Sequence, residues 1–177
     1  MKFVRRFAPY LVLVLLLAAS GVLFFRHNEL LDWFWTRNYE PPAAIRSLTT
    51  DTGMTPYAQR LFYVNKPSLE ERDAFNEHCK DISDQVAVLG CYTGDRQGIY
   101  LYNVTEPRLA GIVEVTAAHE MLHQAYDRLK GSERKRIDGL LQAYYDKGAP
   151  DAIKAQVDTY KKSEPHELLN EMHSIFG

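Results

Sequence analysis

The sequence predicts an α+β domain, built from a small antiparallel sheet and several helices, behind one N-terminal transmembrane helix. Three observations support this prediction. An uncharged, mostly apolar run of 19 residues lies near the N-terminus, at 7–25; short strand-like segments follow in the middle of the chain; and helix-like segments fill the C-terminal part. Strands that come first in the chain and helices that come later are typical of the α+β class.

The apolar run has the length and flanking charges of a membrane anchor. As a helix it would span about 28 Å, which matches the hydrocarbon core of a bilayer. Lys2, Arg5 and Arg6 precede it and Arg26 ends it, and basic residues on this side favour a cytoplasmic N-terminus. We therefore expect a single-pass protein of the cell membrane with an extracytoplasmic domain. A cleaved signal peptide is the alternative, because residues 18–20 are small.

Composition predicts three regions along the chain. The basic segment and anchor occupy 1–26, and a juxtamembrane segment with a linker occupies 27–56, because 40–56 is rich in Pro, Thr and small residues. Trp33, Phe34 and Trp35 could lie at the outer membrane interface. The remaining residues, 57–177, are enough for one domain with a single core.

Charge argues against one class of partner. The first 40 residues carry five Lys or Arg and three Asp or Glu, which leaves 16 basic and 20 acidic residues in the rest of the chain. The remainder has no basic stripe. Nucleic-acid binding therefore has no electrostatic support.

Cys79 and Cys91 are the two cysteines of the chain. In an exported domain, two cysteines more often form a disulfide than remain free, and a bridge would close a short loop here. Two free thiols are the alternative. Metal binding by this pair is less favoured, since His78 is the one other ligand type nearby in sequence.

Residue patterns predict the elements of the domain in order. Strands are expected at 61–64, 86–92 and 99–104, the last two as an antiparallel pair. Ser68 begins a capping-box pattern that predicts a helix to about 80. Further helices are expected at 113–130, from Ser132 to 147, from Asp151, and from Ser163 with Pro165 in its first turn.

The most informative feature is the run His119-Glu120-Met121-Leu122-His123 within the helix expected at 113–130. Residues four apart lie on one face of a helix, so both imidazoles can reach one Zn²⁺. Glu120 lies beside them, where it could accept a proton from a water molecule at the metal. The run predicts a zinc site with a general base. Two histidines with only surface or packing roles are the alternative.

With its later segment Glu167-Leu168-Leu169-Asn170-Glu171, the chain resembles the gluzincins, a clan of zinc peptidases. The resemblance implies a compact zincin-like fold over about 99–177. It also implies that His119, His123 and Glu167 bind zinc, that Glu120 is the general base, and that Glu171 orients His119 from behind. The metzincins are excluded, because no glycine and third histidine follow His123 at the required spacing.

The resemblance leaves some roles open. Glu171 could be the third ligand instead of Glu167, and His166 could also coordinate. Thermolysin, one member of the clan, has Asp where this chain has Glu171, and the histidine that stabilises the transition state in larger relatives has no counterpart before Gly177. Five residues are candidates for that role: Tyr126, Tyr144, Tyr145, Tyr160 and His173.

These features predict a membrane-anchored zinc metallopeptidase that acts on a peptide or protein substrate. An edge strand before the motif helix commonly holds the substrate backbone in zincins, and 99–104 is in the expected place. A non-catalytic, membrane-tethered zinc-binding interaction module is the alternative function. A third hypothesis keeps hydrolysis but changes the substrate to a cell-wall peptide or another amide.

Overall fold

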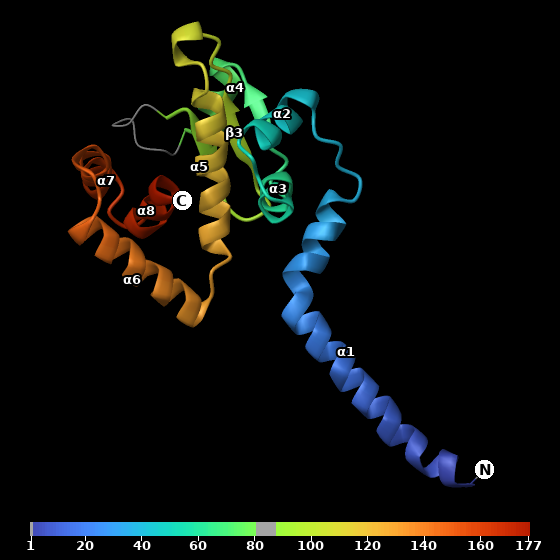
Figure 1. Ribbon diagram of the computed structural model, residues 1–177. Helices are drawn as coiled ribbons and strands as arrows, with labels where there is room; N and C mark the ends of the chain where they lie inside the picture. The colour runs from blue at the N-terminus through green and yellow to red at the C-terminus, as the bar shows by residue number, and fades with distance from the viewer. Residues whose placement is uncertain (1, 81–87) are drawn as a thin grey trace. The chain divides into compact units, whose positions relative to one another are not determined.

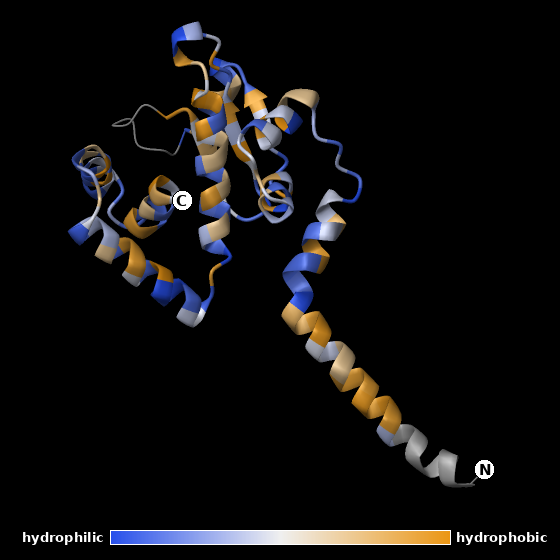
Figure 2. Cartoon of the chain, viewed as in Figure 1, coloured by the Kyte–Doolittle hydropathy of each residue, from blue (hydrophilic) through white to orange (hydrophobic). Residues whose placement is uncertain are grey.

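The fold was analysed in a computed structural model that describes residues 2–80 and 88–177. The chain divides into two units, residues 1–38 and residues 39–177. The first unit is the helix α1 (Lys2–Thr36). Its stretch Tyr10–Thr36 is long and apolar enough to cross a membrane, a property that a signal sequence shares. Figure 2 shows the first part of this stretch mostly in orange, followed by hydrophilic residues in blue towards the end of α1.

The second unit is mostly helical, with one small mixed sheet. Strand β3 (Ile99–Tyr102) is central; β1 (Ser68–Glu70) pairs with it in parallel and β2 (Gly90–Tyr92) pairs with it antiparallel. The expected antiparallel pairing is therefore confirmed for 90–92 with 99–101, while residues 86 and 87 of the expected strand lie outside the described residues. The sheet as a whole is mixed because β1 runs parallel to its neighbour.

The edge-strand prediction for 99–104 is wrong. β3 has a partner on each side, so it offers no free edge to a substrate. The edge strand beside the motif helix is β2 instead. The prediction is wrong because 68–70 was expected to begin a helix. These residues instead form β1 and pair with one edge of β3.

Three local predictions around the sheet also fail. The expected linker contains α2 (Ala43–Asp51), whose Ile45 and Leu48 are buried in the core. The strand expected at 61–64 is the end of α3 (Pro56–Tyr63), which Thr55 caps through its side chain and Pro56 begins. The helix expected from Ser68 is α4 (Arg72–His78), which begins after β1.

The packed unit also begins earlier than the expected residue 57. Tyr39 packs its ring against Tyr63, with centroids 6.2 Å apart, and donates a hydrogen bond to the Pro67 carbonyl. Residues 39–56 therefore belong to the folded unit rather than to a tether.

Helix α5 (Ile112–Asp127) carries the motif and lies between two hydrophobic clusters. On one side Ala117 and Met121 join the core formed by α2, α3 and the sheet. On the other side Tyr126 joins a second core with α6 (Gly131–Lys147), α7 (Asp151–Ser163) and α8 (Leu168–Phe176). Figure 1 shows α5 between the sheet and the three C-terminal helices. This position buries the motif from both sides.

Candidate metal centre and cleft

The two motif histidines point their Nε2 atoms at the same place. His119 and His123 lie one turn apart on α5, and their Nε2 atoms are 3.1 Å apart. Their rings are nearly perpendicular, at 87°. Two imidazole nitrogens that converge in this way form the first half of a metal site.

Glu171 of α8 completes the group. Its carboxylate oxygens lie 3.5 Å from His119 Nε2 and 3.5 Å from His123 Nε2. One ligand atom from each of the three residues lies within 4.8 Å of the others. Among the described residues, this arrangement could hold a metal ion, with Glu171 as the third ligand.

Glu167, the third ligand that the resemblance implies, lies outside this group. It is exposed and precedes α8 as its N-cap residue. Its carboxylate accepts a hydrogen bond from Asn170 Nδ2 at 3.4 Å. His166, the other alternative, is exposed as well. The geometry thus favours Glu171 as the third ligand, because its carboxylate faces both histidines, whereas Glu167 is exposed and its carboxylate contacts Asn170.

Helix α8 also fixes the orientation of both imidazoles. His123 Nδ1 lies 3.0 Å from Asn170 Oδ1 and 3.1 Å from Ser174 Oγ, while His119 hydrogen-bonds the main chain of Ser174. An amide oxygen accepts, so Nδ1 of His123 carries the proton and its Nε2 keeps a lone pair. Ligands of metals are commonly oriented in this manner.

Burial and charge change the pKa values of the histidines in opposite directions. Burial alone lowers the pKa of His119, but the carboxylates of Glu171 and Glu120 outweigh it, and the net pKa is raised. For His123 burial dominates, and its pKa is lowered. A neutral His123 is the form that can donate a lone pair to a metal.

Glu120 is buried beside the histidines, with its side chain under strand β2. The main chain of Tyr92 hydrogen-bonds its carboxylate, yet burial raises the pKa of Glu120 to about 7. Gly90 makes room for it: a Cβ at this position would lie 2.5 Å from Thr116 Cγ2 and 2.8 Å from Glu120 Oε1. The glycine therefore allows the strand to lie close to the general-base candidate.

Exchange of Gly90 to Ala is expected to disturb both the fold and the site. Overpacking of this size lowers the free energy of unfolding by about 1–3 kcal/mol, and Glu120 must move to relieve the contact. Gly139→Ala is the matched control, because no atom lies within 4 Å of its Cβ position. Urea unfolding of both variants checks the prediction; equal midpoints for Gly90→Ala and the wild type would contradict it.

A cleft of about 530 Å³ contains the centre. Its walls come from the segment 88–94, the exposed side of α5, one face of α7 and the start of α8. Among the described lining residues none is Lys or Arg, whereas five are acidic: Glu120, Asp127, Glu164, Glu167 and Glu171. The cleft is thus a negatively charged groove with the three converging candidate ligands inside it.

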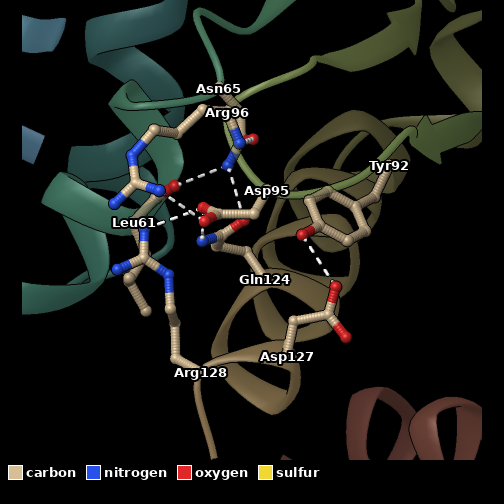
Figure 3. A network of polar contacts seen from close by, with 8 residues as sticks. All are labelled: Leu61, Asn65, Tyr92, Asp95, Arg96, Gln124, Asp127 and Arg128. Atoms are coloured by element: carbon tan, nitrogen blue, oxygen red, sulfur yellow. Dashed lines mark hydrogen bonds and ion pairs between the residues drawn. The ribbon is translucent and has the colours of Figure 1, made fainter. Parts of the chain in front are cut away.

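A separate polar network holds the cleft wall against α5 (Figure 3). Asp95, in the turn after β2, accepts hydrogen bonds from Gln124 Nε2 and Arg128 Nη2, each at 2.8 Å. Asn65 bridges Gln124 and the main chain of Arg96. Because Gln124 follows His123 directly, this network fixes the turn relative to the motif.

Tyr92 extends that support to the centre itself. Its hydroxyl donates to Asp127 Oδ2 at 2.9 Å, and its ring lies parallel to that of His123, with centroids 6.3 Å apart. Tyr92 therefore links β2 to α5 in two ways, through its hydroxyl at Asp127 and through its ring at His123.

A disulfide joins Cys79, after α4, to Cys91 in β2, as the sequence led us to expect. The bridge anchors the strand that lines the cleft. Replacing both cysteines by Ala is expected to lower the free energy of unfolding by about 3 kcal/mol, since the closed loop spans about a dozen residues. Urea unfolding with and without dithiothreitol checks this. A wild-type midpoint that dithiothreitol leaves unchanged would contradict it.

Sequence reasoning missed Asn170, Ser174 and Gly90. The first two lie on the same face of α8 as Glu171, so they could have been found once that face was known. No sequence pattern around Gly90 indicated its role. The chain matched no protein-family model, no curated protein and no solved structure, so a functional assignment rests on the geometry of this site.

Proposed function

We propose that this chain is a membrane-anchored zinc peptidase whose cleft faces the extracytoplasmic side. The observation that carries the proposal is the convergence of His119, His123 and Glu171 in one cleft, with Glu120 buried beside them. The apolar stretch of α1 and the basic residues at the start of this helix support the anchor and its orientation.

The donor set fits zinc. Two imidazole nitrogens and one carboxylate oxygen, with a fourth position open, are typical of catalytic zinc sites. Glu171 Oε2 is buried, and its contact with His119 Nε2 at 3.5 Å is long for a hydrogen bond. A buried carboxylate oxygen that is so weakly satisfied is costly, and a cation between Glu171 and the histidines would remove that cost.

Each group in the cleft would have a separate role in the reaction. Zinc, when bound, supplies a Lewis acid that makes water more acidic and polarises a carbonyl group. Glu120 accepts the proton of the attacking water and later gives it to the leaving amine. Asn170 and Ser174 hold His123 in the orientation that this chemistry needs.

Strand β2 would hold the substrate backbone. The Leu89 carbonyl accepts from Tyr102 of β3 and the Thr93 amide donates to Gly98 just before β3, so, by the alternation of an antiparallel ladder, the main-chain groups of Gly90 and the carbonyl of Tyr92 point to the outer edge. The Tyr92 amide on this side bonds to Glu120. An extended peptide could pair there. The acidic lining would favour substrates that carry positive charge.

Hydrolysis of an unfolded protein by the full chain in detergent tests the proposal. We expect cleavage that a chelator abolishes and added zinc restores. A chain that binds zinc but cleaves no substrate would favour the non-catalytic interaction module instead.

A further inference from the structure

One face of α7 lines the cleft. Gln156 and Tyr160 lie four residues apart on α7, so they share one face of this helix, and Glu164 is the residue that caps its C-terminus. All three line the cleft that contains the candidate metal ligands. Only Tyr160 among them has a hydroxyl donor. Burial, and after it the negative charges of Glu171, Glu120 and Glu164, raise the pKa of Tyr160 to about 12. Tyr160 therefore shares the cleft with Glu120 and the candidate metal ligands.

The other candidates for a transition-state donor have different roles. Tyr126 donates its hydroxyl proton to Asp138, and Tyr145 donates to Asp158. Tyr144 packs against Phe176, and His173 lies against the ring of Tyr126. None of these four lines the cleft. Within the described part of the chain, the Tyr160 hydroxyl makes no hydrogen bond that would have to be broken.

We propose that Tyr160 donates a hydrogen bond to the oxyanion formed from the scissile carbonyl. The inference rests on the proposed peptidase function. The water oxygen bonds to the carbonyl carbon, one water proton passes to Glu120, and the carbonyl π pair moves to the oxygen. The Tyr160 hydroxyl donates to that oxygen and keeps its proton. When the C–N bond breaks, the pair returns to the carbonyl, and the proton on Glu120 goes to the leaving nitrogen.

Such a donor acts on the transition state rather than on substrate binding. Loss of one oxyanion donor typically lowers kcat by 10²–10³-fold. The Tyr160→Phe chain should therefore keep its zinc content and its circular dichroism spectrum, show a KM close to that of the wild type, and lose about 10²-fold in kcat. Tyr144→Phe is the matched control, since Tyr144 lies outside the cleft, and it should keep wild-type kcat.

A binding measurement complements the kinetics. A phosphinic analogue of a cleaved peptide carries a tetrahedral, anionic centre, and its Kd should rise in Tyr160→Phe by about the same factor as kcat falls. Uncleaved peptide should bind Glu120→Gln and the double variant Glu120→Gln/Tyr160→Phe equally.

Three results would overturn the inference while the proposed function stands: unchanged kcat in Tyr160→Phe, loss of zinc in that variant, or unchanged analogue binding. A wild-type chain that hydrolyses nothing would overturn the proposed function and this inference with it.

Discussion

The Glu120→Gln chain is expected to bind zinc as the wild type does and to hydrolyse peptide about 10³-fold more slowly. Gln has the volume of Glu and keeps an oxygen that can accept the hydrogen bond from the main chain of Tyr92. Its amide cannot accept a proton near neutral pH, and a general base contributes about 10²–10⁴-fold to the rate. Single-substrate kinetics and metal analysis of the purified full chain measure the two parts of this prediction.

Glu133→Gln provides the control for the loss of one negative charge. Glu133 is exposed in the first turn of α6 and does not line the cleft, so this variant should hydrolyse peptide at the wild-type rate. If Glu120→Gln were as active as Glu133→Gln, Glu120 would not be the general base. If it lost zinc, its role would be in metal binding.

The second large effect separates the two glutamates of the C-terminal segment. Glu171→Gln is expected to weaken zinc binding by about 10³-fold, more than the 10–100-fold typical when a group behind a ligand is lost. Glu167→Gln should weaken zinc binding by about tenfold or less, because the Glu167 carboxylate is linked to the centre through its hydrogen bond with Asn170, which in turn contacts His123. The two variants remove the same charge four residues apart, so each is the control for the other.

Titration of each variant against a chromophoric zinc chelator gives both affinities. The reverse order, with Glu167→Gln the weaker binder, would return Glu167 to the position of third ligand. Equal affinities close to that of the wild type would show that neither glutamate binds the metal.

The motif helix could be predicted from sequence because its signal is local. The spacing of His119 and His123 puts them on one face of any helix, and Glu120 between them has a chemical reason to be there. The disulfide could also be predicted from sequence, because the chain has two cysteines and the apolar N-terminus suggested an exported domain. The prediction of the motif helix and that of the disulfide each depended on only a few residues.

The choice between Glu167 and Glu171 could not be made in this way. Both spacings satisfy the same pattern, and the choice depends on where α8 begins and how it packs on α5. Pro165 and the turn before Leu168 shift that start beyond Glu167. The face that meets the histidines is then the one with Asn170, Glu171 and Ser174.

The elements before the motif could not be predicted from sequence for a related reason. Helix α2 buries only Ile45, Leu48 and Thr49, too few positions to show a helical period among Pro and Thr residues. Residues 61–64 have the composition of a strand, but the Thr55 cap, Pro56 and core packing make them the end of α3. Tertiary contacts, rather than the local sequence pattern, determine the secondary structure of these two segments.

The zinc content of the full chain, purified in detergent without chelators, tests the central claim most directly. The account predicts about one zinc per chain in the wild type, and none in His119→Ala/His123→Ala when that variant keeps the helical circular dichroism of the wild type. A well-folded wild-type chain that stays metal-free even after zinc is supplied would contradict the metal centre, and the proposed peptidase with it.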